Sequence, residues 1–368
     1  MKLIKLISIL VFIGGIMLAT SALTSSNHPG DVNVSEQRAH HKAKGGFINT
    51  SPSFTDDTAI LPLLKRYITE TRVDATPTME IPVMTVTAEL LRNLPKNQDT
   101  VIRLGHSSIF LQVDGQRWLI DPVFSKRASP FSFAGPKRFH QPPIALTDLP
   151  SIDGVMISHD HYDHLDKASI KHLAKSVAYF VVPLGVDKHL TDWGVKPNQI
   201  HSLDWWQAHN SSGVTITATP TQHFSGRSLF DKNDTLWASY VIQSTNSSLY
   251  FSGDSGYFDG FKQIGERFGP FDLTMVETGA YDKDWATIHM TPEQSLQAHI
   301  DLQGKKMMPI HNGTFDLAFH SWYDPLNQIT QLASDANIEI VTPKMGELIA
   351  VNEIHETSQW WAALANEL

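Results

Sequence analysis

Residues 159–164, His-Asp-His-Tyr-Asp-His, bring three imidazoles and two carboxylates into six positions directly after an apolar stretch. Neutral imidazole and carboxylate are the ligands that Zn²⁺ and similar cations prefer. A strand that ends in a short loop can direct His159 and His161 to one point and Asp163 and His164 to a neighbouring point. Function concentrates in loops held by a rigid strand. We therefore predict a metal site here, with two ions rather than one.

Three further candidate ligands follow strand-like segments later in the chain: His223, Asp254 and His311. Gly253 and Gly256 beside Asp254 allow a close approach of the backbone. Two metals about 3.5–4 Å apart activate a shared water and stabilise the entering and leaving oxygens of a displacement. The predicted division is His159, His161 and His223 for one ion, Asp163, His164 and His311 for the other, with Asp254 shared.

The elements that must position these ligands are interspersed strands and helices. Segments 101–104, 108–113 and 116–120 are typical of strands, and Asp114-Gly115 between the last two predicts a hairpin. Further strands are expected at 178–182, 214–218, 237–243 and 248–252, and helices at 59–71, 167–175, 258–268 and 291–301. In the last helix Thr291 is a suitable N-cap, followed by Pro292. This alternation predicts an α/β fold.

Composition excludes several classes of protein. The 368 residues are 41% hydrophobic and 18% charged, as in an ordinary folded protein. A net charge of -9 without a long basic stripe argues against nucleic-acid binding. The absence of cysteine excludes disulfides, thiolate nucleophiles and cysteine-ligated zinc.

The two ends of the chain differ in composition from the centre. Residues 1–22 combine two lysines, an apolar run and small residues, which predicts a secretory signal peptide, with a membrane anchor as the alternative. We expect export to the periplasm of a bacterium, or anchoring in its inner membrane. Residues 23–99 are predicted to be a polar linker and N-terminal arm, with His40 and His41 as a solvated pair. The hydrolase domain is expected at 100–355 and a tail at 356–368.

The ligand pattern resembles that of the metallo-β-lactamase superfamily, which implies an αββα sandwich. Most of the chain after Thr100 more closely resembles the zinc-dependent N-acyl-phosphatidylethanolamine-hydrolysing phospholipase D family. The matching segments are Asp121-Pro122-Val123-Phe124-Ser125, Arg127-Ala128-Ser129-Pro130, Gly135-Pro136-Lys137-Arg138-Phe139, Leu203-Asp204-Trp205-Trp206, Gly269-Pro270-Phe271-Asp272-Leu273, and Ile310-His311 with Gly313-Thr314-Phe315. Asn312 departs from the family, in which an aromatic residue is common after this histidine.

The resemblance implies phosphodiester hydrolysis with two Zn²⁺ held by the seven ligands, other divalent metals being compatible with the same donors. It also implies an active-site role for His289, which we expect to act with Asp163 in catalysis. His289 precedes a helix N-cap, so imidazole and helix dipole can face a phosphate together, and a general acid here protonates the leaving alkoxide. A purely capping role is the alternative. Asp121 is expected either to orient a ligand histidine or to serve a structural turn, and His106 has the same two readings.

The predicted substrate is a membrane phospholipid, such as N-acyl-phosphatidylethanolamine, cleaved to phosphatidic acid and N-acylethanolamine. The pairs Lys126-Arg127 and Lys137-Arg138 either meet the lipid phosphate or form a solvated basic loop. A soluble hydrolase of the same superfamily, such as a sugar-phosphate lactonase, is the alternative, because the metal ligands alone do not separate the two. A non-catalytic metal-binding module is the third reading, although such a module would be expected to lose ligands.

Overall fold

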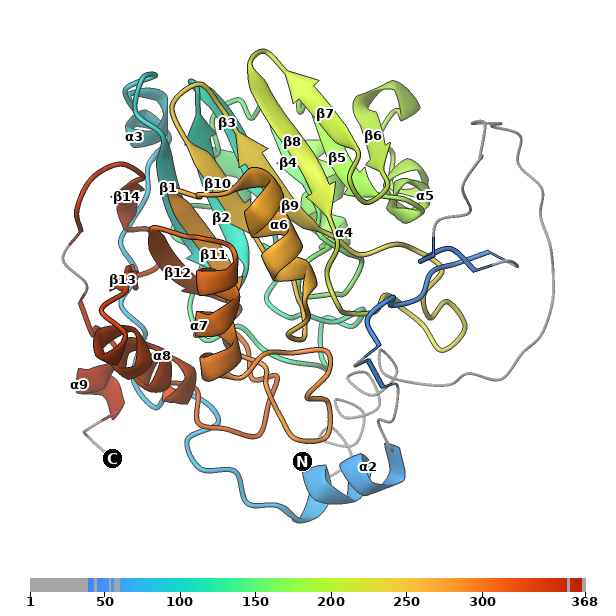
Figure 1. Ribbon diagram of the computed structural model, residues 1–368, viewed down its shortest axis with the longest axis vertical. Helices are drawn as coiled ribbons and strands as arrows, with labels where there is room; N and C mark the ends of the chain where they lie inside the picture. The colour runs from blue at the N-terminus through green and yellow to red at the C-terminus, as the bar shows by residue number, and fades with distance from the viewer. Residues whose placement is uncertain (1–38, 43–44, 53, 56–59, 356–357, 366–368) are drawn as a thin grey trace.

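The computed structural model describes residues 39–42, 45–52, 54–55, 60–355 and 358–365. Two seven-stranded sheets pack face to face, and helices cover the outer face of each sheet (Figure 1). The predicted αββα sandwich is confirmed. The predicted signal peptide or anchor, residues 1–22, lies outside the described residues. Within the described part of the chain, every helix is too short or too polar to cross a bilayer.

The first sheet is antiparallel at one side and parallel at the other. Its order is β14 (Leu348–Ala350), β1 (Thr100–Gly105), β2 (Ser108–Val113), β3 (Gln116–Ile120), β4 (Gly154–Met156), β5 (Tyr179–Pro183) and β6 (Ile200–Leu203). The predicted hairpin between β2 and β3 is confirmed, and both turn residues have positive φ: Asp114 at 46° and Gly115 at 74°. The strands from β3 to β6 run parallel.

The second sheet has the order β13 (Glu339–Ile340), β12 (Lys306–Ile310), β11 (Leu273–Glu277), β10 (Ser248–Phe251), β9 (Ser239–Gln243), β8 (Val214–Thr219) and β7 (Ala208–Ser211). Strands β9 and β10, both expected from the sequence, pair antiparallel. The strands from β10 to β13 run parallel. Four parallel strands therefore place their carboxyl ends at one edge of this sheet.

The helices are α2 (Ile60–Thr69), α3 (Ala88–Arg92), α4 (Lys167–Leu173), α5 (Val186–Asp192), α6 (Gly260–Phe268), α7 (Pro292–Asp301), α8 (Asp324–Asp335) and α9 (Ala362–Ala365), with 3₁₀ turns η1 (Leu146–Asp148) and η2 (Pro197–Gln199). Helix α7 begins as predicted. The Thr291 side chain accepts from the Gln294 N–H, and the Gln294 side chain accepts from the Thr291 N–H. This capping box satisfies backbone donors at the helix start.

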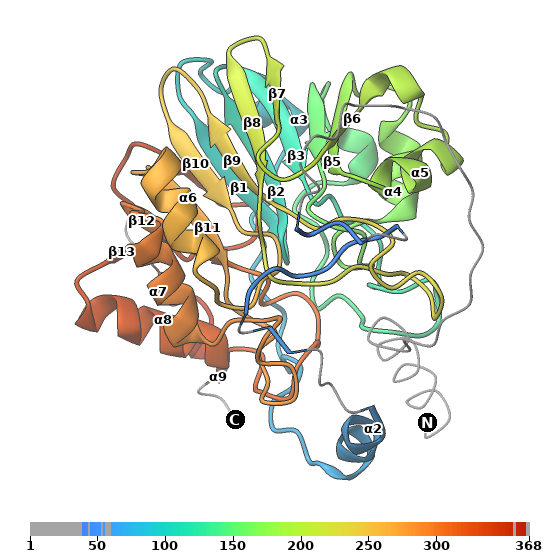
Figure 2. The same cartoon turned by 45° about the vertical axis from the view of Figure 1, so that its right-hand side comes forward.

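The core consists of one apolar layer between the sheets and one beneath each set of helices. Trp118, Trp237 and Phe251 are fully buried between the sheets. Burial of one such side chain is worth roughly 1.5–3 kcal/mol, so the strands are held rigidly. Figure 2 shows the loops that follow β4, β8 and β12 converging at one edge of the sandwich. That edge carries the candidate site.

The described part of the N-terminal arm packs against this domain. The prediction that His40 and His41 are a solvated pair was wrong. His40 is 6% exposed and His41 is half-buried, and both rings contact the Asp204 carboxylate. A polar composition predicted weak packing, but it cannot reveal a partner 164 residues away in the sequence.

Candidate metal centre and active site

The loop after β4 is fixed by Asp121, which follows β3. The Asp121 carboxylate accepts from the Ser158 N–H at 2.7 Å and from the Ser158 hydroxyl at 2.6 Å. It also lies 2.7 Å from Nδ1 of His164. Asp121 thus orients a predicted ligand histidine and leaves its Nε2 facing the site, which is the first of its two predicted roles. Its own φ of 43° is a backbone strain of the kind found at functional sites.

Asp160 is the one member of the loop's acidic pair that points away from the site. Its carboxylate accepts from the Gly226 N–H at 2.8 Å and lies 3.3 Å from the His189 ring. Burial by itself would raise the pKa of Asp160, but the His189 contact and the neighbouring charges lower it. Asp160 therefore ties the metal-binding loop to the loop after β8.

One group of four donors is formed by His159, His161, His223 and Asp254, whose candidate ligand atoms lie within 4.8 Å of one another. Nε2 of His159 and Nδ1 of His161 are 2.9 Å apart. Nε2 of His223 lies 3.3 Å from the same Nδ1. Nδ1 of His223 lies 3.0 Å from the Ile288 carbonyl, to which it donates, so Nε2 is the nitrogen left for a metal.

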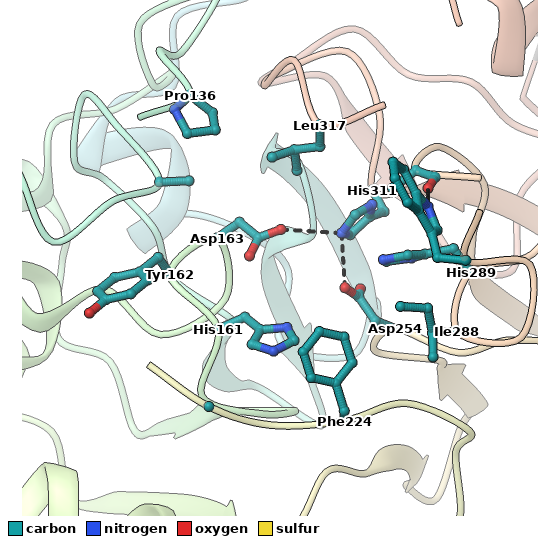
Figure 3. Close-up of a pocket in the computed structure, with 14 residues that line it drawn as sticks. Pro136, His161, Tyr162, Asp163, Phe224, Asp254, Ile288, His289, His311 and Leu317 are labelled. Carbon is teal, nitrogen blue, oxygen red and sulfur yellow. Dashed lines mark hydrogen bonds and ion pairs between the residues drawn. The ribbon is translucent and has the colours of Figure 1, made fainter. Parts of the chain in front are cut away.

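A second group of four donors contains His106, Asp163, His164 and His311, again within 4.8 Å. Nε2 of His311 lies 3.3 Å from Asp163 and 3.0 Å from Asp254 (Figure 3). Nε2 of His164 lies 3.1 Å from the other oxygen of Asp254. Asp254 therefore contacts both groups, as the predicted shared ligand should, and all seven predicted ligands meet at one place.

His106 is the donor whose role the sequence left open. Its Nε2 lies 3.0 Å from Asp163, and its ring centroid is 3.9 Å from that of His311. His106 has a φ of 49° and His311 a φ of 64°, and their backbones pair at an isolated bridge between His106 and Asn312. The turn after β1 and the end of β12 therefore fix this side of the site together.

The donor chemistry fits a metal. Within the described residues, Nε2 of His164 and Oδ1 of Asp254 are both buried without a hydrogen-bond partner, because the 3.1 Å contact between them lacks hydrogen-bond geometry. Unsatisfied buried polar atoms are rare and call for an explanation. Burial holds the pKa of His159 and His223 well below the usual range, so both rings are neutral, the form that ligates metals.

The same region attracts positive charge. Burial alone would raise the pKa of Asp254, but His164 and His311 hold it well below the usual carboxyl range. Burial alone would lower the pKa of His311, yet Asp254 and Asp163 raise it to about 10. Buried carboxylates that draw a proton onto a neighbouring imidazole would be satisfied equally by a bound cation.

His289 lies beside these groups and contacts a carboxylate that sequence reasoning missed. Its Nδ1 bonds to Glu277, the last residue of β11, and Glu277 also accepts from the Ser255 N–H at 2.6 Å. Burial raises the pKa of Glu277, and the contact with His289 acts in the opposite direction. The position of Glu277 at a buried strand end, the same position that singled out Asp254, was the available signal.

The loop that carries His289 packs closely on the loop that carries Asp254. A Cβ on Gly256 would lie 1.9 Å from the Thr287 carbonyl, so the predicted need for glycine is confirmed at this position. The Gln222 side chain donates to the same carbonyl at 2.8 Å. His289 is thereby placed in one group with Asp254 and His311.

A cavity opens over the metal-ligand groups (Figure 3). His161, Asp163, Asp254, His289 and His311 form its polar base. The other lining residues are mostly apolar: Ala128, Pro136, Tyr162, Phe224, Gly226, Ala280, Trp285, Ile288 and Leu317. The site thus combines clustered charge with a predominantly apolar wall.

The basic pairs near this cavity divide into two kinds. Lys126 and Lys137 are exposed, whereas Arg138 is 7% exposed and donates to the Val123 carbonyl. Arg127 donates to the Gly135 carbonyl at 2.6 Å. The prediction that Arg138 meets a phosphate or solvent was therefore wrong, because its guanidinium holds the backbone of its own loop.

Comparison with known proteins agrees with this geometry. A family model described as "Beta-lactamase superfamily domain" matches residues 116–312, more than half of the chain. The chain belongs to the metallo-β-lactamase superfamily. The structure Igni18, a metallo hydrolase from Ignicoccus hospitalis, shares this superfamily fold with a TM-score of 0.55 and 23% identity, over 70% of this chain and 100% of that one.

Two sequence relatives narrow the relationship within the superfamily. An uncharacterised protein of Mycobacterium tuberculosis is 40% identical over 89% of this chain and 88% of its own length. The N-acyl-phosphatidylethanolamine-hydrolyzing phospholipase D 1 of Caenorhabditis elegans is 35% identical over 67% of this chain and 74% of its own length. The chain is therefore a metal-dependent hydrolase of the metallo-β-lactamase superfamily, related to these phospholipases, as its sequence resemblance predicted.

Proposed function

We propose that this hydrolase cleaves the phosphodiester of a membrane phospholipid, N-acyl-phosphatidylethanolamine being the predicted substrate, with two bound Zn²⁺ ions. The observation that carries the proposal is the pair of donor groups joined by Asp254 at the base of an apolar cavity. Two adjacent metal positions suit phosphodiester hydrolysis, and an apolar wall suits acyl chains.

His159, His161 and His223 would hold one ion, Asp163, His164 and His311 the other, and Asp254 would bridge them. His106 would support the second position through Asp163, 3.0 Å away. When bound, the two ions supply Lewis acidity to the phosphoryl group and activate water at neutral pH. The chain's own residues orient the ligands and exclude bulk water, since the donors other than His161 and Asp163 are almost fully buried.

His289 is the proposed acid. Glu277 accepts a hydrogen bond from its Nδ1, which fixes the ring and leaves Nε2 to carry a proton toward the leaving alkoxide. Glu277 is a positioning residue, because it acts through the imidazole.

Exposed aromatic residues in two loops that line the cavity support the proposal of a membrane-held substrate. Phe131 and Phe133 are 43% and 65% exposed in the loop that contributes Ala128 and Pro136 to the cavity wall. Phe230 is 93% exposed in the loop that begins near Gly226. Aromatic rings at such positions suit the interface between headgroups and acyl chains. Exposed Lys126 and Lys137 lie in or beside the first of these loops, where cations would attract anionic headgroups.

The test is product analysis by mass spectrometry on a panel of vesicle phospholipids, with zinc-loaded protein and a sugar-phosphate lactone as an added substrate. We expect phosphatidic acid and N-acylethanolamine from N-acyl-phosphatidylethanolamine. We expect no such products from His159→Ala protein, in which one ligand is removed. Turnover of the lactone alone, or equal phospholipid turnover by wild type and His159→Ala, would contradict the proposal.

A further inference from the structure

A third group of metal-ligating side chains lies outside the catalytic cavity and joins the N-terminal arm to the domain. It consists of His40, His41 and Asp204, whose ligand atoms lie within 4.8 Å of one another. Nε2 of His40 is 2.6 Å from one oxygen of Asp204, and Nε2 of His41 is 2.8 Å from the other. Two imidazoles therefore converge on the two oxygens of one carboxylate.

The surroundings hold these donors in place. The His40 ring stacks on Trp205 with centroids 4.2 Å apart, and the His41 ring meets the edge of Phe47 at 5.1 Å. The backbone N–H of Trp205 donates to the Asp204 carboxylate at 2.8 Å, the kind of support that orients a metal-binding carboxylate. His40 and Asp204 are almost fully buried, whereas His41 is partly open to solvent, so an ion has a way in.

We propose that His40, His41 and Asp204 bind a divalent transition metal such as Zn²⁺, separately from the catalytic centre. Two imidazole nitrogens and two carboxylate oxygens provide four donors of the types zinc accepts. The ion would link the described residues of the arm between 39 and 55 to the domain, because His40 and His41 lie among them and Asp204 follows β6. All of residues 39–55 lie outside the part of the chain that matches the superfamily model.

The fastened segment also supports the catalytic centre. Phe47 is 7% exposed and packs into the layer between the two sheets. The Asn49 side chain donates to the His223 carbonyl at 2.6 Å and accepts from the His223 N–H at 3.1 Å. A metal at one end of this segment would thus stabilise the backbone position of a catalytic ligand at the other.

The first experiment measures zinc per chain in zinc-saturated, desalted wild type, His40→Gln, His41→Gln and His209→Gln. Glutamine keeps an N–H donor for Asp204 but is a poor zinc ligand, so each of the first two variants separates ligation from hydrogen bonding. We expect each to lose one equivalent of zinc. His209→Gln is the matched control, because His209 and His201 are also paired imidazoles, 3.9 Å apart, and belong to no three-donor group within the described residues. Unchanged zinc content in both His40→Gln and His41→Gln would overturn the proposal.

The second experiment needs no variant. Zinc-edge anomalous scattering from zinc-loaded wild-type crystals should give a peak between the two imidazoles and Asp204, in addition to any at the catalytic centre. Peaks confined to the catalytic donors would show that the three residues share hydrogen bonds only. Neither measurement uses a substrate, so its outcome is independent of the proposed phospholipid hydrolysis.

Discussion

The two sheets supply the catalytic centre in different ways. The first sheet delivers His159, His161, Asp163 and His164 from one loop after β4, within six consecutive residues. The second sheet delivers one donor at a time, since His223 follows β8, Asp254 follows β10 and His311 follows β12. The first set depends on the local geometry of a loop, whereas the second depends on the order of strands in a sheet.

This difference determines which substitutions should disturb the metal ligands most. The loop is braced by two buried carboxylates. Asp121 contacts both Ser158 and His164, and Asp160 connects the loop to Gly226 and His189. The separate donors are braced by neighbouring loops, as when the Ile288 carbonyl orients His223. Asp254 is the point at which the two arrangements meet, because its oxygens contact His164 from the first set and His311 from the second.

The largest effect is expected from Asp254→Asn. Loss of the shared ligand should weaken both metal positions and remove several kcal/mol of transition-state stabilisation, about 10⁴-fold in kcat/KM. The measurement is phospholipid turnover together with zinc per chain. Asp259→Asn, an exposed position five residues along, is the control and should retain full activity. Equal zinc content in Asp254→Asn and wild type would show that Asp254 does not join the two groups.

A smaller loss is expected at His289, the proposed general acid. His289→Gln should lower kcat by about 10²- to 10³-fold, since it removes proton transfer to the leaving group. Glu277→Gln should lower kcat less, with zinc content unchanged in both variants. Because Glu277 acts through His289, the double variant should be no slower than His289→Gln alone. A double variant with the two losses multiplied would contradict this coupling.

Removal of the Asp121 carboxylate, which holds the loop after β4, should reduce activity less than the changes at Asp254 and His289. Asp121→Asn keeps the size of the side chain but removes its charge, and we expect about a 10- to 100-fold loss in zinc affinity or activity. Zinc affinity is measured by competition with a chelator. The matched control is Asp114→Asn, which makes the same change at another residue of positive φ directly after a strand. Equal zinc affinity in Asp121→Asn and wild type would make Asp121 a turn residue only.

A buried histidine outside the site should affect stability and leave turnover unchanged. His299 of α7 lies 2.7 Å from the Thr274 hydroxyl, and burial lowers its pKa to about 4. The unfolded chain then binds this proton more readily than the folded one, so stability should fall as pH drops from about 6.5 towards about 4, by on the order of 3 kcal/mol. Urea unfolding across this range should show a shallower fall for His299→Gln. Identical dependence of stability on pH in His299→Gln and wild type would show that His299 does not cause the loss of stability at low pH.

The contrast between the sheets also explains what the sequence could predict. The loop at 159–164 was identifiable because its donors are adjacent, and the start of α7 because capping is a local rule. The sequence could predict His223, Asp254 and His311 as ligands only on the assumption that the ends of separate strands meet at one edge of a sheet. Glu277 occupies the same kind of position but was missed, because its partner His289 comes from a different loop.

The errors have the same physical origin. His40 and His41 were predicted to be solvated because the surrounding segment is polar, yet Trp205 and Asp204 bury His40. Arg138 was expected to face a phosphate or solvent, but it donates to a backbone carbonyl of its own loop. In both regions the deciding partner is a tertiary contact that local composition does not encode.

The most direct test of the proposed chemistry is hydrolysis of N-acyl-phosphatidylethanolamine vesicles in oxygen-18 water by zinc-loaded wild-type protein, with both products analysed by mass spectrometry. Attack of water on phosphorus breaks the bond from phosphorus to the ethanolamine oxygen, so we expect one labelled oxygen in phosphatidic acid and none in N-acylethanolamine. Label in a released fatty acid, or no release of N-acylethanolamine, would contradict it.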